Sequence, residues 1–146
     1  MNKILTISIG NDHAGFKMKF DIIRYLKKEG FNVINKGCDG SDSVDYPDYG
    51  HSVAQDVINN IAQKGIVICG SGNGINMSVN KHKGIRSALC WNKEIAELAV
   101  KHNNANIIAL PARYISTKEA INCVHEFINN NFEGGRHELR VNKINF

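Results

Sequence analysis

The fold is decided by one stretch, residues 65–74, with the sequence Gly65-Ile66-Val67-Ile68-Cys69-Gly70-Ser71-Gly72-Asn73-Gly74. Its first half is uninterruptedly apolar, which is typical of a parallel strand that is covered on both faces of a sheet. Its second half alternates glycine with other residues, so the backbone can turn sharply and aim several N–H groups at one point. The stretch therefore predicts a buried strand that leads into a loop for an anion or a developing oxyanion.

The same kind of apolar run recurs along the chain, in alternation with segments whose apolar residues are spaced three and four positions apart. The expected strands are Ile4–Ile9, Phe31–Ile34, Gly65–Cys69, Ser87–Cys90 and Asn106–Leu110. The expected helices are Phe16–Lys28, Val53–Ala62, Glu94–His102 and Thr117–Ile128, and Pro47 is a suitable start for a helix.

This alternation predicts an α/β protein with a three-layer, Rossmann-like (flavodoxin-like) fold. About five parallel strands should carry helices on both faces, and a helical tail should follow at the C-terminus. The length of 146 residues suits one domain that spans residues 1–146.

The composition excludes several classes of protein. The chain is 42% hydrophobic and 22% charged, with a net charge of +4, as expected for a soluble globular protein. The basic C-terminal segment is short and lacks interleaved aromatic residues, so no nucleic-acid partner is expected. No run is long and apolar enough to suggest a membrane span, and no signal peptide is evident. The four cysteines lack zinc-type spacing, and we expect reduced thiols and a cytoplasmic location without a metal.

Ligands of open parallel sheets bind at the carboxyl ends of the strands. Asp12 and His13 follow the first expected strand, Cys69 ends the third, and Arg113 follows the fifth. Asp12 is equally suited to cap the next helix, and His13 to lie exposed on the surface. A buried cysteine is often only a small apolar residue, but the glycine loop beside Cys69 favours a functional role.

Three familiar loops are excluded at residues 69–75. A dinucleotide-binding GxGxxG motif would need glycine at Ile75, and a phosphate-binding P-loop would need a Lys-Ser/Thr pair that is absent. A phosphatase-type loop would need arginine at the position of Ile75. Elsewhere, Arg136 and Arg140 are four residues apart, so on a helix they would share one face that suits a phosphate or simply solvent.

Six stretches together resemble the ribose-5-phosphate isomerase B family, which also includes galactose-6-phosphate and allose-6-phosphate isomerases. The resemblance extends over nearly the whole chain. The matching stretches are Gly10-Asn11-Asp12-His13-Ala14-Gly15, Asp45-Tyr46-Pro47, Ile68 to Ile75, Asn80-Lys81 with Gly84-Ile85-Arg86, His102-Asn103 with Asn106, and Gly134-Gly135-Arg136-His137.

The resemblance implies a role for each matching residue. Cys69 resembles the catalytic base, Ser71 the hydroxyl that moves protons between sugar oxygens, and His102 the group that opens the furanose ring. The backbone of Gly70, Gly72, Asn73 and Gly74 resembles the anion hole. The implied sugar contacts are Asp12, Tyr46 and Asn103, and the implied phosphate contacts are His13, Arg113, Arg136 and Arg140.

The resemblance also implies an activity and a partner. The expected reaction interconverts ribose 5-phosphate and ribulose 5-phosphate through an ene-diolate in the pentose phosphate pathway, with no cofactor and no metal. The expected assembly is a homodimer with shared active sites, in which the C-terminal arginines complete the neighbour's site. The pairing of dimers into tetramers stays open.

Two features refine this expectation. Some family members use a glutamate where this chain has Ile75, which leaves Cys69 as the base. The galactose-6-phosphate branch tends to lose the ring-opening histidine and the Gly-Gly-Arg-His stretch, both of which this chain keeps, and this favours the pentose phosphate. The alternatives are an isomerase of a six-carbon aldose 6-phosphate and a non-catalytic module that binds sugar phosphates.

Overall fold

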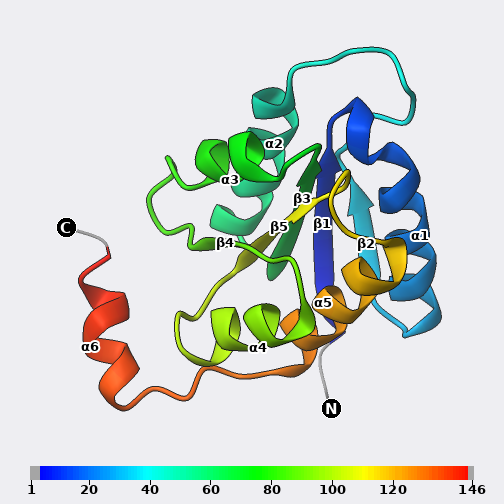
Figure 1. Cartoon of the computed structure of the whole chain (residues 1–146). Coiled ribbons are helices and arrows are strands. Elements are labelled where there is room, and N and C mark those ends of the chain that lie inside the picture. Colours follow the sequence, from blue (N-terminus) through cyan, green and yellow to red (C-terminus); the bar gives the residue numbers. More distant parts are fainter. Residues whose placement is uncertain (1–3, 145–146) are drawn as a thin grey trace.

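The computed structural model describes residues 4–144 and confirms the predicted fold class (Figure 1). Five parallel strands form one sheet in the order β2-β1-β3-β5-β4. The strands are β1 (Thr6–Asn11), β2 (Asn32–Asn35), β3 (Lys64–Cys69), β4 (Ser87–Leu89) and β5 (Ile107–Pro111). Since all run the same way, their carboxyl ends share one edge of the sheet and their amino ends share the other.

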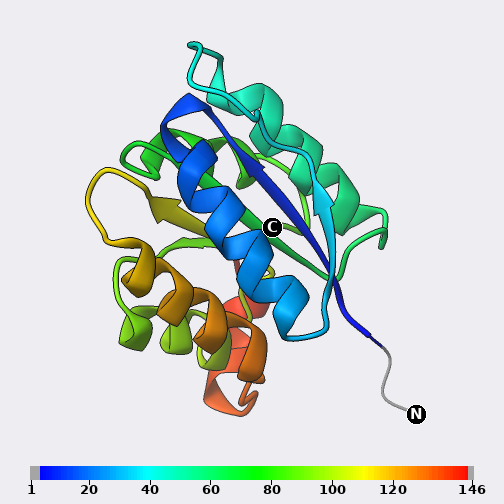
Figure 2. The same ribbon diagram turned by 90° about the vertical axis from the view of Figure 1, so that its right-hand side faces the viewer.

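Helices cover both faces of this sheet (Figure 2). A 3-10 turn, η1 (His13–Gly15), precedes α1 (Phe16–Lys28). On one face of the sheet, α5 (Thr117–Asn129) packs against both α1 and α4 (Lys93–Lys101). The other face carries α2 (Tyr46–Ile58) and α3 (Asn73–Val79), and α6 (Arg136–Asn142) stands apart from both layers in Figure 1. Within residues 4–144, no helix has both the length and the apolar character needed to cross a bilayer.

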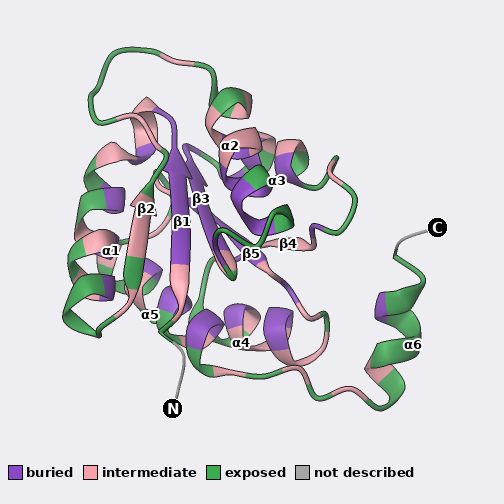
Figure 3. Cartoon of the chain, turned by 180° about the vertical axis from the view of Figure 1, so that it is seen from behind, coloured by how far each residue is buried: buried purple, intermediate pink, exposed green. Residues whose placement is uncertain are grey.

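The central strand β3 is buried on both sides, as its apolar run predicts (Figure 3). Ile66 and Ile68 belong to the core cluster under α1, α4 and α5, whereas Val67 and Cys69 belong to the cluster under α2 and α3. Successive side chains of a strand point to opposite faces, so each face of β3 needs its own apolar set. The side chain of Cys69 therefore faces the α2–α3 layer.

The predicted helix Val53–Ala62 is wrong in both bounds, because α2 begins at Tyr46 and ends at Ile58. The observed start confirms Pro47 as a helix-starting residue, since Pro47 is the second residue of α2. Gly50 is a buried position in the first half of the helix, where a Cβ would lie 3.1 Å from Cγ1 of Ile75. A glycine that allows this close approach adds nothing to the apolar pattern, so the period is visible only from Val53. The helix ends earlier because Asn60 adopts a left-handed conformation with φ 58°.

The first strand is displaced from its predicted range of Ile4–Ile9 and continues to Asn11. Asn11 is fully buried, and its carbonyl accepts a hydrogen bond from the backbone N–H of Cys38 at 3.2 Å. In the sequence, a polar residue at the end of an apolar run resembles a strand boundary. The hydrogen bond to the carbonyl of Asn11 comes from a distant segment, which the local pattern does not reveal. The other strands agree with their predicted ranges to within one residue at each end.

Candidate active site

A cleft of about 320 Å³ lies at the carboxyl edge of the sheet. It joins the ends of β1, β3 and β5 to the start of α2. Its lining consists of Asp12, Tyr46, Cys69, Gly70, Ser71, Gly74, Arg113 and Tyr114, and we name this set the carboxyl-edge cleft. All except Tyr114 are residues that the sequence predicts. Tyr114 follows Arg113 directly, and its place after the fifth strand was the signal that could have found it.

Cys69 is a buried residue in the lining of this cleft. It is the last residue of β3, only 4% of it is exposed, and it packs in the apolar cluster that contains Ile75 and Ala109. Its carbonyl accepts a hydrogen bond from the backbone N–H of Ala112 at 3.0 Å, which fixes the strand end. The thiol is thus held between an apolar wall and the start of the glycine loop.

The glycine loop brings Arg113 to the cleft. The backbone N–H of Arg113 donates to the carbonyl of Gly70 at 3.0 Å. A Cβ on residue 70 would lie only 2.9 Å from Nη1 of Arg113, so the glycine lets the guanidinium cross the loop closely. A guanidinium in this place can bind an anionic group with two parallel hydrogen bonds.

The end of the loop starts α3 at Asn73, two residues after Ser71. Gly72 has φ 76°, a left-handed conformation that favours glycine, and a Cβ there would lie 2.5 Å from Cδ1 of Leu89. The hydroxyl of the exposed Ser71 accepts a hydrogen bond from the backbone N–H of Asn73 at 3.3 Å. Gly72 and Asn73 therefore shape the turn, while the lining is made by Ser71 and Gly74.

Asp12 confirms the capping interpretation and also lines the cleft. Its Oδ1 accepts a hydrogen bond from the backbone N–H of Ala14 at 2.9 Å, so it caps η1. Its backbone N–H donates to the carbonyl of Ile68 at 3.2 Å, which ties the end of β1 to the end of β3. Asp12 is 6% exposed, and its hydrogen bonds hold it at the cleft.

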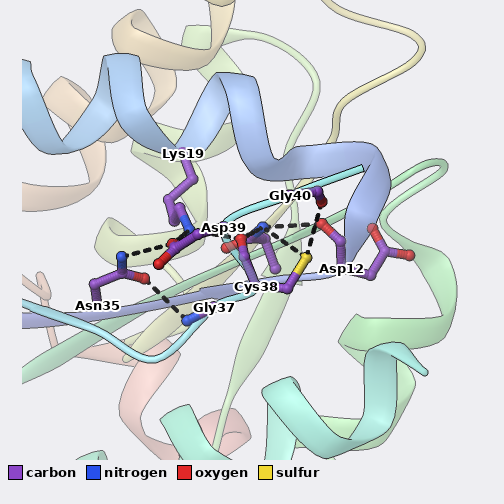
Figure 4. A network of polar contacts seen from close by, with 8 residues as sticks. Asp12, Lys19, Asn35, Gly37, Cys38, Asp39 and Gly40 are labelled. Carbon is purple, nitrogen blue, oxygen red and sulfur yellow. Dashed lines mark hydrogen bonds and ion pairs between the residues drawn. The ribbon is translucent and has the colours of Figure 1, made fainter. Parts of the chain in front are cut away.

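A polar network behind Asp12 fixes the segment that leads to α2 (Figure 4). The amide Nδ2 of Asn11 donates to the carbonyls of Asp12 and Cys38, each at 2.9 Å. The fully buried side chain of Lys19 donates to the same carbonyl of Cys38 at 2.6 Å and pairs with Asp39. The hydrogen bond from Lys19 lowers the pKa of Asp39 below its ordinary value. One buried cation thus anchors the turn that follows β2.

His13 supports the end of the same segment. Its Nδ1 accepts a hydrogen bond from the backbone N–H of Val44 at 3.2 Å, two residues before α2. A neutral imidazole that accepts at Nδ1 carries its proton on Nε2, and Nε2 is then a donor. His13 lies on η1, directly after Asp12, and does not form part of the lining.

The remaining predicted residues lie at the opposite edge of the sheet. His102 and Asn103 follow α4, which runs back from the carboxyl edge to the amino end of β5. Asn103 lines a second cavity, of about 770 Å³, together with Arg86 and Ile144. Within one chain the structure therefore does not bring His102 and Asn103 to Cys69.

Arg136 and Arg140 also lie away from the carboxyl-edge cleft. They occupy α6, and Nη1 of Arg140 donates to the carbonyl of Arg136 at 3.2 Å, as expected for residues one turn apart. The segment before α6 is tied to the end of α4 by a 3.0 Å hydrogen bond from the N–H of Glu133 to the carbonyl of Lys101. The predicted site is thus divided between the two edges of the sheet.

Comparison with known proteins identifies the family of this chain. The model of the ribose/galactose isomerase family matches residues 7–144. The chain is similar to ribose-5-phosphate isomerase B of Escherichia coli, with 38% identity over 94% of this chain and 93% of that protein.

Solved structures agree with this match. Ribose-5-phosphate isomerase B of Clostridium thermocellum has 45% identity and a TM-score of 0.94, over 96% of this chain and 95% of that one. The Mycoplasma genitalium enzyme, solved with bound ribulose-5-phosphate, has 41% identity and a TM-score of 0.91, over 95% of this chain and 93% of that one. With both the sequence and the fold matched over nearly its whole length, the chain belongs to the ribose/galactose isomerase family.

Proposed function

We propose that this chain is an aldose–ketose isomerase that interconverts ribose 5-phosphate and ribulose 5-phosphate in the pentose phosphate pathway. The observation that carries the proposal is the position of Cys69, a buried residue that lines the cleft where the glycine loop begins. The sugar phosphate bound in the Mycoplasma genitalium structure supports this substrate. The cysteines are unpaired, which suits a cytoplasmic enzyme.

The reaction needs a base beside a carbon acid and donors for the oxyanion that develops. As a thiolate, Cys69 removes the proton from C2 of the open-chain aldose. The electron pair of that bond forms the C1–C2 double bond, and O1 becomes an oxyanion that the loop N–H groups stabilise. Ser71 carries a proton from O2 to O1, and the thiol of Cys69 returns its proton to C1 as the C2 carbonyl forms.

The rim of the cleft suits the rest of the substrate. Arg113 crosses the glycine loop and offers a guanidinium to the phosphate. His13, next to Asp12 in the chain, accepts from Val44 at Nδ1 and would offer Nε2 to the substrate as a donor. Asp12 and Tyr46 line the space between, where the hydroxyl groups of the sugar would lie.

The division of the site between two edges supports a homodimer with shared active sites. His102 lies at the amino edge of its own sheet, so a site that uses both His102 and Cys69 must combine two copies of the chain. Asn103, Arg136 and Arg140 lie on the same side of the molecule as His102, so the same neighbouring chain would contribute them to the shared site. A closed two-fold assembly forms two equivalent sites of this kind.

The test of the reaction is turnover of ribose 5-phosphate by wild type and by Cys69→Ala, without added metal. Loss of a general base should lower turnover by about 10²-fold or more while the fold is kept. Full turnover by the folded variant would reject Cys69 as the base. Turnover of allose or galactose 6-phosphate instead of ribose 5-phosphate would change the substrate, and binding without any turnover would favour a binding module.

The shared site can be tested by mixing two inactive variants, Cys69→Ala and His102→Ala. Random reassociation makes about half of the dimers mixed, each with one intact site, so about a quarter of wild-type activity should return. The control is each variant alone, dissociated and reassociated in the same way. No recovery from subunits shown to exchange would mean that both residues act within one chain's own site.

A further inference from the structure

Three side chains converge at the end of α4, away from the carboxyl-edge cleft. Nε2 of His102 lies 3.6 Å from Oε1 of Glu133. The ring of His137 is stacked on the ring of His102, with centroids 4.1 Å apart and planes 12° from parallel. We name these three residues the His102 cluster. Nothing in the reaction described above uses Glu133 or His137.

The backbone holds the cluster in place. The N–H of Glu133 donates to the carbonyl of Lys101 at 3.0 Å, which anchors Glu133 beside the residue that precedes His102. The N–H of His137 donates to the carbonyl of Gly134 at 3.1 Å, and Gly134 has φ 68°, so the turn into α6 is tight. Two backbone hydrogen bonds thus hold the segments that carry Glu133 and His137 beside the end of α4.

The charges nearby leave Glu133 available to His102. Lys101, the adjacent cation, pairs with Glu97 one turn earlier on α4. Within residues 4–144, Glu133 forms its ion pair with His102. A carboxylate beside one ring nitrogen restrains the rotation of an imidazole.

The arrangement does not suit a metal ion, although the ligand atoms of the three side chains lie within 4.8 Å of one another. An imidazole binds a metal through a lone pair in the plane of its ring. The two rings are nearly parallel and stacked, so their lone pairs cannot converge on one ion. The stack instead fixes the plane of the His102 ring.

We propose that Glu133 is a positioning residue for ring opening: it holds the imidazole of His102 and balances the positive charge that His102 acquires. This inference rests on the proposed function. His102 takes the proton of the O1 hydroxyl, the C1–O1 double bond forms, and the C1–O4 bond breaks with its electron pair on O4. The same proton then passes from His102 to O4. The imidazolium exists only between these transfers, and Glu133 stabilises it there.

Assays that start from the aldose and from the ketose distinguish the role of Glu133 in ring opening from the role of Cys69 in proton transfer. The aldose closes a ring through O4 and must be opened before isomerisation. In ribulose 5-phosphate the C5 oxygen carries the phosphate, so the ketose is open and its C1 proton is directly accessible to Cys69. Exchange of that proton with D₂O therefore requires Cys69 but not ring opening.

The test compares Glu133→Gln with wild type in both assays. We expect turnover of ribose 5-phosphate to fall about tenfold, as is usual when an outer partner of a functional histidine is lost. Exchange of the C1 proton of ribulose 5-phosphate, followed by NMR in D₂O, should stay within about twofold of wild type. Glu133→Asp, which keeps the charge, should restore part of the lost turnover.

The matched control is Glu138→Gln, which removes the same charge from the exposed surface of α6, five positions along the chain. Both activities of this variant should equal those of wild type. Equal loss of both activities in Glu133→Gln would make Glu133 merely structural, and unchanged turnover would show that His102 does not depend on it; either overturns the proposal. If wild type itself shows neither turnover nor exchange, the proposed function fails instead.

Discussion

The ring of Tyr46 rests directly on the backbone of Gly74: a Cβ on residue 74 would lie 2.4 Å from Cζ of Tyr46 and 2.6 Å from its hydroxyl oxygen. Tyr46 is the first residue of α2, and Gly74 is the second residue of α3. Two segments of the cleft wall are therefore in contact only because one of them has no side chain. The tyrosine is 38% exposed and lines the cleft from this position.

Gly74→Ala should displace this ring and weaken substrate binding. The new methyl group occupies the place of the aromatic ring, and we expect the KM for ribose 5-phosphate to rise about tenfold because one wall of the site moves. The free energy of unfolding should change little, since alanine favours the helix by about 1 kcal/mol and offsets part of the strain. Gly40→Ala is the control, because nothing lies within 4 Å of a Cβ there. Unchanged kinetics in Gly74→Ala would exclude Tyr46 from substrate binding.

Arg113→Lys should separate binding from catalysis. Lysine keeps the positive charge but loses the planar pair of donors that matches a phosphate. We expect the KM to rise about tenfold or more while kcat changes less, because the phosphate is held in the ground state and the transition state alike. Steady-state kinetics check this, with Arg24→Lys on the exposed side of α1 as the matched control. A fall in kcat with an unchanged KM would contradict a phosphate-binding role.

Asp39→Asn should reduce stability at neutral pH more than at low pH. The hydrogen bonds from Lys19 and then Asn35 lower the pKa of the Asp39 carboxyl below its ordinary value of 3.8. Its stabilising contribution is therefore complete above that ordinary value and is lost as the pH falls through the lower folded pKa. Urea unfolding from about pH 7 down to about pH 2 should show the two proteins converging at the acid end. A constant difference across this range would mean that the charge of Asp39 contributes nothing.

Lys64 should make wild-type stability rise at alkaline pH. Burial lowers the pKa of Lys64 from 10.5 to about 8, and its ammonium donates to the carbonyl of Phe127 at 2.6 Å. Below the folded pKa both states hold the proton, but between about 8 and 10.5 only the unfolded state does, so the free energy of unfolding increases with pH. Lys64→Met should lack this increase when both proteins are unfolded in urea at about pH 7 and about pH 10. Parallel curves for the two proteins would reject the lowered pKa.

Much of the fold could be predicted because local patterns encode it. The apolar run that ends at Cys69 identifies an interior parallel strand, and the 3.6-residue period gives the bounds of α1 without error. The prediction was wrong where a residue serves a distant neighbour. Gly50 lies within α2, where its missing side chain allows the close approach of α3, and Asn11 belongs to β1 because it pairs with Ile68 of β3.

The sequence by itself determined which residues lie at or just after the carboxyl ends of the strands, and so predicted that Asp12, Cys69 and Arg113 share one edge of the sheet. The loop of glycines after Cys69 also followed from the sequence, because a sharp turn with convergent N–H groups needs those residues.

Only the tertiary structure decided which distant segments share a site. It placed Tyr46 on Gly74, added Tyr114 to the lining, and put His102 at the opposite edge beside Glu133. These relations depend on the strand order β2-β1-β3-β5-β4 and on the path of each crossover. A local period reports which face of an element is buried, but it carries no information on which distant element covers that face.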